Sequence, residues 1–459
     1  MTDHNTTQCV LFPNLFRKPV TVRFDAEQGS SDGGAILLKA VDERLGLIER
    51  LSKSLGDKRD PERVRHGLDE LVAQRVYGIA CGYADGNDAA RLADDPVHKL
   101  LVGRDPAGGD ALASQPTLSR FENAVGPRAL YRMGEALADV VVDRHRKRLG
   151  RHVRRITIDL DPTDDPTHGQ QQLTFFNGHY DTWCYMPVVA FATFDNEPEQ
   201  YLLAAVLRPG NASAKLGALG ILRRLLGRLR EAFPRARFLV RLDGGFACPE
   251  LFDFLDEEPK LDYVVAMAKN LTLERSAEFW MPSARKRSRE SGKTAHVYGA
   301  SHYKAKKWSR ERRVVIKAEV VRHPGRDPKE NPRFVITNLR RSPKWIYEKV
   351  YCGRGDIENR IKELHHGLEI DRTSCSRFWA NQFRVMLTAA AYVLMQELRL
   401  AARGTHCARA QVSTLRERLL KLGARVVVSC RRIVLHLPRS CAALDAWTRI
   451  ASNLGAVSP

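Results

Sequence analysis

The spacing of apolar residues changes near residue 154. Before this point, apolar residues recur every three or four positions over 35–52 and 61–82, which predicts helices, and an alternating stretch at 20–24 predicts a short strand. Beyond it, compact apolar or alternating runs predict five strands, at 155–161, 186–194, 201–207, 237–243 and 263–268. We therefore expect a mainly helical N-terminal part followed by an α/β part.

The order of the predicted elements indicates the fold of the α/β part. Three consecutive strands are followed by a helix over 215–232, a strand, a second helix and a last strand. The polar segment 195–200 joins the second and third strands as a hairpin would. This order fits a mixed five-stranded sheet of the ribonuclease H type. Strand patterns at 314–322 and 333–339 then predict a β-rich insertion, and an apolar helix is expected over 378–402.

Charge indicates a polyanionic partner. Lysine and arginine number 74 against 54 acidic residues, a net charge of +20 at pH 7, which favours binding to phosphate backbones or to an anionic membrane surface. No window of 18 residues is apolar enough to span a membrane, and residues 1–8 lack the basic and apolar regions of a secretory signal. Nine cysteines without a C-x-x-C pair fit reduced thiols. We expect a cytoplasmic protein.

A basic segment lies within the predicted insertion. Between 285 and 313 eleven lysines and arginines face only two acidic residues, with aromatic residues interleaved. Basic residues with spaced aromatics suit a nucleic-acid backbone and stacking on an unpaired base. Trp308 is the candidate for stacking, and burial in the core of the insertion is the equal alternative. The basic residues nearest to it are Lys306, Lys307 and Arg310.

A short polar helix is predicted near residue 115. Pro116 suits a helix start, and Ser119 with Glu122 has the spacing of a capping box. Gln115 and Arg120 lie near its start and could read a major groove as part of a recognition helix. An ordinary capped surface helix explains the same residues equally well.

Three carboxylates stand where divalent cations could be held. Asp161 and Asp243 each end a predicted strand, and strand ends are where open α/β sheets place their ligands. Asp159, Asp164 and Asp165 lie close enough to compete with Asp161. The third carboxylate is Glu358. At about 100° per helical residue it shares one helix face with Tyr351, Arg354 and Lys362. Three carboxylates can hold the two Mg²⁺ ions that phosphodiester chemistry uses.

With these residues in order, the chain resembles the DDE transposases of bacterial insertion sequences. Their signature is a tyrosine, an arginine three positions on, a glutamate four further and a lysine seven further. Tyr351, Arg354 and Glu358 match it, but the last position is His365, and Lys362 lies on the same face. The strings 164–171 and 115–123 are similar to the insertion-sequence family numbered thirteen-eighty, and the resemblance covers nearly the full length.

The resemblance implies a role for each site residue. Asp161, Asp243 and Glu358 would bind two Mg²⁺ ions, for which Mn²⁺ can substitute. Tyr351, Arg354 and either Lys362 or His365 would hold phosphates of the transposon end. The implied partners are double-stranded DNA, both the terminal inverted repeats and the target, and a second protomer in a dimer on paired ends. The protein would act at the bacterial nucleoid.

Combining pattern and resemblance divides the chain into five segments. They are a helical DNA-binding domain over 1–150, the first part of a catalytic core over 151–270, the basic β-rich insertion over 271–340, the second part of the core with the glutamate helix over 341–402, and a C-terminal extension over 403–459, a candidate dimerisation element. The activity implied is two-metal DNA strand cleavage and strand transfer. Two alternatives remain: a domesticated DNA-binding relative without transposition, and a ribonuclease H-type nuclease.

Overall fold

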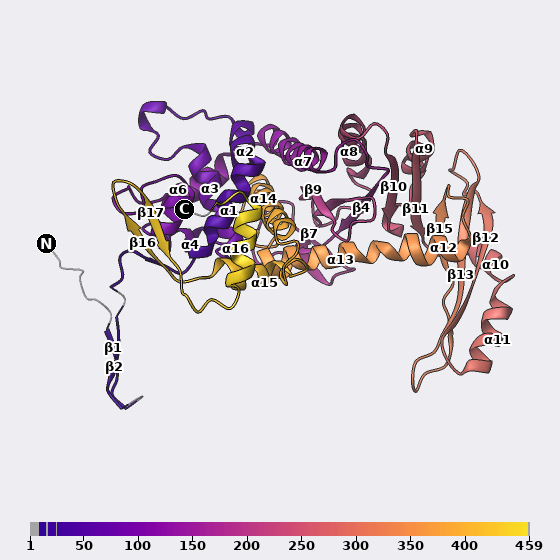
Figure 1. Ribbon diagram of the computed structural model, residues 1–459. Helices are drawn as coiled ribbons and strands as arrows, with labels where there is room; N and C mark the ends of the chain where they lie inside the picture. The colour runs from indigo at the N-terminus through magenta and orange to yellow at the C-terminus, as the bar shows by residue number, and fades with distance from the viewer. Residues whose placement is uncertain (1–8, 15–16, 24, 458–459) are drawn as a thin grey trace.

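The computed structural model describes residues 9–14, 17–23 and 25–457. Residues 1–8, on which the expectation about a secretory signal rests, and residue 24, the end of the first predicted strand, lie outside the described residues. The described chain is elongated, with the N-terminal helices at one end, a large sheet in the middle and the insertion at the other end (Figure 1). Within the described part, no helix has the length and apolar character needed to cross a bilayer.

The predicted strands of the α/β part lie side by side in one mixed sheet. Their spatial order is β9, β8, β4, β10, β11, with β8 antiparallel to β4 and β9, and β10 parallel to β4 and β11. The bounds are β4 Arg155–Pro162, β8 Val188–Phe194, β9 Tyr201–Val206, β10 Arg237–Leu242 and β11 Leu261–Met267. Apolar residues face both sides of these strands, because helices cover both faces.

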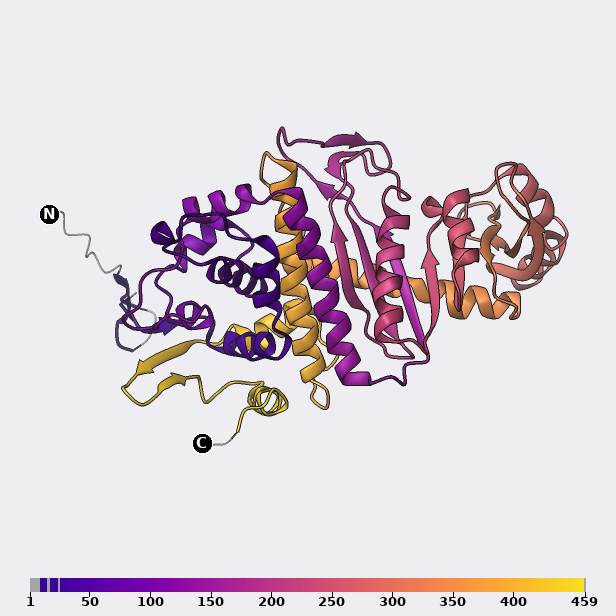
Figure 2. The same ribbon diagram turned by 90° about the horizontal axis from the view of Figure 1, so that it is seen from above.

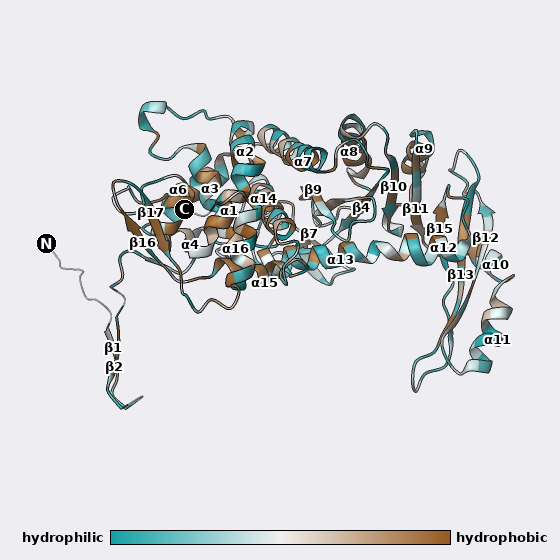
Figure 3. Ribbon diagram, in the orientation of Figure 1, coloured by the Kyte–Doolittle hydropathy of each residue, from teal (hydrophilic) through white to brown (hydrophobic). Residues whose placement is uncertain are grey.

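The sheet does not end at five strands, and this corrects the prediction. β15 (Arg333–Thr337) pairs antiparallel with β11, and β13 (Arg312–Val321) and β12 (Ala295–Tyr303) follow, so that with β14 (Lys329–Glu330) the sheet has nine strands. The unpaired edge of β11 exposes backbone N–H and C=O groups, which β15 satisfies. The insertion therefore continues the central sheet and carries the hydrophilic α11 (Met281–Ser291), which occupies part of the predicted basic segment (Figure 3). The preceding helix is α10 (Leu271–Ala277).

Two long helices join the N-terminal part to the sheet. α7 (Pro127–Leu149) and α14 (Phe378–Ala401) run side by side between them (Figure 2). α14 is apolar on nearly all sides and nearly all buried. Its Gln382 and Gln396 hydrogen-bond the free edge of β9: each side-chain oxygen accepts from a backbone N–H in or just after β9, and each amide donates to a carbonyl in or just before β9. α14 thereby covers the β9 edge of the sheet, and β12 forms the opposite edge.

The C-terminal extension folds back onto the N-terminal part. β16 (Ala424–Val428) pairs with β17 (Ile433–His436) and with the short β3 (Gly29–Ser30). The remaining helices of the N- and C-terminal parts are α1 Ile36–Leu45, α2 Leu47–Leu55, α3 Leu68–Ala80, α4 Gly86–Arg91, α5 Pro96–Leu101, α6 Gln115–Ala124, α15 Val412–Leu415 and α16 Leu444–Asn453. The remaining helices of the α/β part are α8 Ala218–Ala232, α9 Pro249–Glu257, α12 Pro343–Trp345 and α13 Gly355–Lys362. Near the N-terminus, β1 (Cys9–Phe12) pairs with β2 (Val20–Arg23).

Candidate active site

Parallel pairing brings the first two predicted carboxylates to one edge of the sheet. On the neighbouring strands β4 and β10, Asp159 stands opposite Arg241. Asp161 and Asp243 each follow two residues later, so both lie where the strands end. Asp161 is only 8% exposed, whereas Asp243 is half-buried and accepts a hydrogen bond from the backbone N–H of Gly245 at 2.8 Å.

The third carboxylate comes from a helical run that crosses below β4, β10 and β11 (Figure 1). This run is not a regular α-helix. Residues Ile346–Tyr351 form a π-helical stretch and Cys352–Arg354 a 3-10 turn, and α13 begins at Gly355. The assumed 100° spacing therefore fails between Tyr351 and Gly355, and such irregular turns are frequent at functional sites. Arg354 nevertheless points at the strand ends and donates to Asp161 Oδ2 at 2.8 Å.

The charges around Asp161 make its ionised form costly. The pKa of Asp161 is raised to about 7, chiefly by burial and in smaller part by the negative charges of Asp243 and Glu358, against the lowering effect of Arg354. Asp243 and Glu358 are thus both within electrostatic reach of Asp161. A buried carboxylate with two further carboxylates near it is a set of oxygen ligands that fits hard divalent cations such as Mg²⁺, whose charge would relieve the repulsion.

Two of the three competing aspartates, Asp159 and Asp165, have partners elsewhere. Asp159 is fully buried and accepts both N–H groups of the Arg241 guanidinium at 2.7 and 2.6 Å, together with Gln200 at 2.8 Å. Asp165 is buried against the hydroxyl of Thr373 at 2.8 Å. The structure therefore separates Asp161 from two chemically identical neighbours by giving those neighbours other partners.

Arg241 also contacts the helical run that bears Glu358. Its Nη1 donates to the carbonyl of Val350 at 3.2 Å, beside Tyr351. A Cβ placed on Gly353 would lie 2.6 Å from the same Nη1 atom. The buried pair of Arg241 with Asp159 thus links β4, β10 and the helix run, the three elements that supply the carboxylates.

The two residues expected to replace the signature lysine have different surroundings. His365 is half-buried, with Nε2 3.0 Å from Thr163 Oγ1 and Nδ1 3.2 Å from Asp371 Oδ2. Lys362 is exposed and forms no ion pair with any residue that the structure describes. His365 therefore fastens the helix run to the segment after Asp161, and Lys362 keeps its ammonium available to a ligand.

The predicted base-stacking residue is buried. Trp308 is 6% exposed, with its ring centroid 4.9 Å from Phe252, 5.2 Å from Tyr303, and Arg312 over its face at 5.0 Å. This is the alternative of burial in a core, because α9 and the insertion close over the ring. Its neighbours Lys306, Lys307 and Arg310 are exposed in the turn between β12 and β13.

The polar helix α6 lies at the opposite end of the molecule from that turn (Figure 1). The expected capping box is wrong: the helix starts at Gln115, Ser119 is inside it, and Glu122 is buried between Arg75 and Arg384 at 2.8 Å from each. Glu122 is occupied by these two arginines, so it cannot reach back to a helix start. Gln115 is half-buried and Arg120 is exposed.

A residue not singled out from the sequence lies beside the carboxylates. Tyr180 is in the turn between β6 (Phe175–Asn177) and β7 (Thr182–Tyr185), and burial together with Asp164, Asp161 and Asp243 raises its pKa. The density of aromatic residues over 175–185 was the signal that could have drawn attention to this hairpin.

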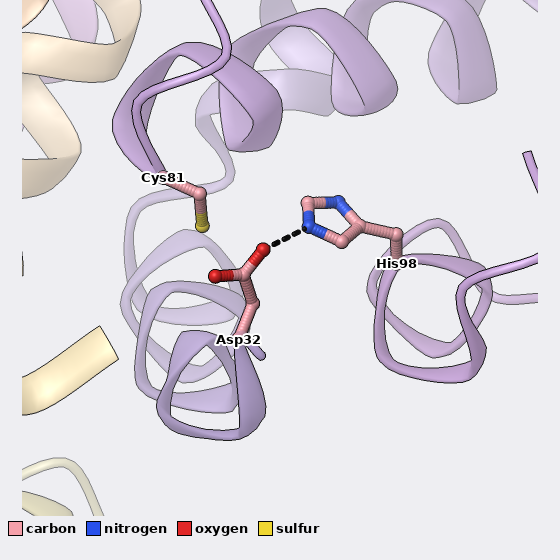
Figure 4. A group of neighbouring side chains, drawn as sticks. All are labelled: Asp32, Cys81 and His98. Carbon is pink, nitrogen blue, oxygen red and sulfur yellow. Dashed lines mark hydrogen bonds and ion pairs between the residues drawn. The ribbon is translucent and has the colours of Figure 1, made fainter. Parts of the chain in front are cut away.

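A second cluster of ligand-type side chains lies in the N-terminal part. Asp32, Cys81 and His98 are buried together, with His98 Nε2 2.9 Å from Asp32 Oδ2 (Figure 4). The ammonium of Lys421 lies 2.8 Å from the other oxygen of Asp32. Burial raises the pKa of the Cys81 thiol, which keeps it protonated. A cation is thus already supplied by Lys421, and the thiol and imidazole do not suit Mg²⁺, so this cluster ties the C-terminal extension to the N-terminal part.

Comparison with known proteins finds a family model that matches nearly the whole chain. The family model described as transposase DDE domain group 1 matches residues 12–459. No curated protein matches the chain. Among solved structures, the cryo-EM structure of a piggyBac transposase synaptic complex with hairpin DNA is similar at 10% sequence identity and a TM-score of 0.42, over 84% of this chain and 79% of that one.

Proposed function

The chain belongs to the DDE transposase family and is a DNA transposase, and from this premise we propose that it cuts and joins DNA strands at the ends of a bacterial insertion sequence, through two metal ions at Asp161, Asp243 and Glu358. The observation that carries the proposal is the parallel pairing of β4 and β10, which places Asp161 and Asp243 at one edge of the sheet, with Glu358 within electrostatic reach of Asp161. A cation bound there would offset the repulsion that Asp243 and Glu358 exert on the ionised form of Asp161.

The chemistry divides between the bound ions and the chain. Asp161, Asp243 and Glu358 would hold two Mg²⁺ ions, or Mn²⁺ in their place, which would supply activation of the attacking oxygen and stabilisation of the leaving oxygen in an in-line displacement at phosphorus. Arg354 orients Asp161 through its 2.8 Å ion pair and offers its remaining N–H groups to a phosphate. Tyr351, half-buried beside Asp243, and the exposed Lys362 hold the neighbouring phosphates.

Segments outside the carboxylate site bind DNA and pair the protomers. We assign the recognition of the terminal repeats to residues 1–150 through Gln115 and Arg120 of α6, and backbone contacts to the basic turn of the insertion with Lys306, Lys307 and Arg310. Residues 151–270 and 341–402 form the catalytic core, and residues 403–459 support a homodimer on paired ends. The location is the cytoplasm, at the nucleoid, where such DNA is found.

The test separates cleavage from binding. Asp243→Ala is expected to abolish cleavage of a labelled transposon end in Mg²⁺ while binding of that end, measured in Ca²⁺, stays within a few-fold of wild type. Asp356→Ala is the matched control, because this exposed carboxylate lies on α13 two residues before Glu358. Loss of binding as large as the loss of cleavage would contradict a metal-binding role for Asp243.

A further inference from the structure

A small hairpin beside the carboxylates exposes large aromatic rings to solvent. Phe175, Phe176 and Trp183 are 38%, 52% and 56% exposed. Phe176 and Trp183 stand directly opposite each other on β6 and β7, and their ring centroids are 6.4 Å apart in an edge-to-face arrangement. Neighbouring exposed aromatics of this size mark a binding surface more often than chance placement does.

The hairpin lies close to the proposed metal site. β7 pairs with the two-residue strand β5 (Asp165–Pro166), and the backbone N–H of Thr167 donates to the carbonyl of Trp183 at 2.9 Å. β5 starts at Asp165, four residues after Asp161, so the Cα atoms of Asp161 and Asp165 are separated by at most about 14 Å. The aromatic rings are therefore within a few nucleotides of a phosphate held at the carboxylates.

The rings stand on a fixed scaffold. Tyr185 Oη donates to the carbonyl of Gln172 at 2.8 Å, and the Asn177 amide donates to the carbonyl of Gly210 at 3.0 Å. Gly210 packs so tightly that a Cβ there would overlap the carbonyl oxygens of Cys184 and Phe175. Because the hairpin is pinned on both sides, ordering Phe176 and Trp183 around a ligand costs little conformational entropy.

Resting on the proposed function, we propose that Phe176 and Trp183 form a platform on which an unpaired base of the bound DNA end stacks next to the cleaved phosphate. Every base has a π-face, so stacking on such rings tolerates any sequence while fixing the strand in place. The occupant is nucleic acid rather than protein because Tyr180, in the turn of the same hairpin, lies within electrostatic reach of Asp161 and Asp243, and the chain carries a net charge of +20. The buried Trp308 is excluded from this role, and Trp183 takes its place.

The test uses a fluorescent base that loses its emission on stacking. The full chain is bound in Ca²⁺ to transposon-end DNA carrying an unpaired 2-aminopurine at successive positions beside the cleavage site. We expect quenching at one or two positions with wild type, loss of that quenching with Trp183→Ala or Phe176→Ala, and its recovery with Trp183→Phe. Affinity for the end falls about 5- to 150-fold in the double alanine variant.

Phe279→Ala is the matched control, since Phe279 is 82% exposed and lies outside the hairpin, between α10 and α11. The substituted rings are at the surface, so the thermal midpoint is expected to stay unchanged. The inference is overturned if wild type quenches at no position, if the hairpin variants quench as wild type does, or if they change only the oligomeric state in sedimentation. The proposed function is read separately: wild type that cuts in Mg²⁺ while Asp243→Ala does not keeps it intact whatever the fluorescence shows.

Discussion

Substituting Gly353 by alanine tests whether the buried Arg241 positions the carboxylates. Gly353 lies in the 3-10 turn between Tyr351 and Glu358, and an added Cβ would sit 2.6 Å from Arg241 Nη1. Ordinary contact begins at 3.4 Å, so either the guanidinium or the turn must move by about 0.8 Å, which is 3.4 minus 2.6. The Arg241 guanidinium cannot move freely, because its two hydrogen bonds to the Asp159 carboxylate are 2.7 Å or shorter.

The expected cost follows from this overlap. Overpacking of this kind destabilises a fold by about 1–3 kcal/mol, and a displacement of about 1 Å in a catalytic group costs on the order of 100-fold in rate. We therefore expect Gly353→Ala to cut transposon-end DNA about 100-fold more slowly and to need more Mg²⁺ for half-maximal rate. Binding of the end in Ca²⁺ is expected to stay near wild type, since no proposed phosphate contact is removed.

The assay compares this variant with Gly355→Ala. Gly355 begins α13, and a Cβ there meets no atom within 4 Å, so alanine is expected to leave cleavage unchanged and to stabilise the helix slightly. Cleavage rates are measured across a Mg²⁺ titration, with denaturant unfolding of each variant alongside. A cleavage rate of Gly353→Ala equal to that of wild type, or an equal loss of cleavage rate in both variants, would refute the positioning role of Arg241.

Three further predictions concern other charged groups. Lys362→Ala is expected to weaken binding of the DNA end and to reduce the slope of log affinity against log salt by about 1, because one phosphate contact is lost; titrations at several salt concentrations check this. Burial lowers the pKa of His145 to about 3, so below its ordinary value of about 6.5 the unfolded chain binds a proton that the folded chain refuses. Folding stability should then fall by about 2 kcal/mol between pH 6.5 and 5, and denaturant unfolding of His145→Gln should show a flatter dependence over that range. Lys421→Met leaves the buried Asp32 without its cation and is expected to cost about 3–5 kcal/mol in unfolding free energy, with Lys421→Arg losing less.

Much of the α/β part could be predicted because its signals are local. The runs at 155–161 and 237–243 became β4 and β10 since apolar side chains at strand spacing bury well whatever lies next to them. The polar helix at residue 115 was predicted correctly, but the capping box predicted for it does not form, because Glu122 pairs with Arg75 and Arg384, which are distant in the chain. The pairing of β15 with β11 could likewise not be predicted, because the sequence of a strand does not reveal which strand pairs with its edge.

The sequence by itself determined the strands and helices, the excess of positive charge and the signature residues that identify a DDE transposase. Tertiary structure decided which side chains are available for chemistry. Asp159 and Asp161 are alike in pattern, but Arg241 of β10 holds Asp159 in a fully buried ion pair, whereas Asp161 pairs with Arg354 at the strand ends near Asp243. Trp308 and Trp183 are the same residue type among other aromatic residues, and only long-range packing buries Trp308 and leaves Trp183 exposed. Burial and pairing depend on residues distant in the chain, which local patterns do not encode.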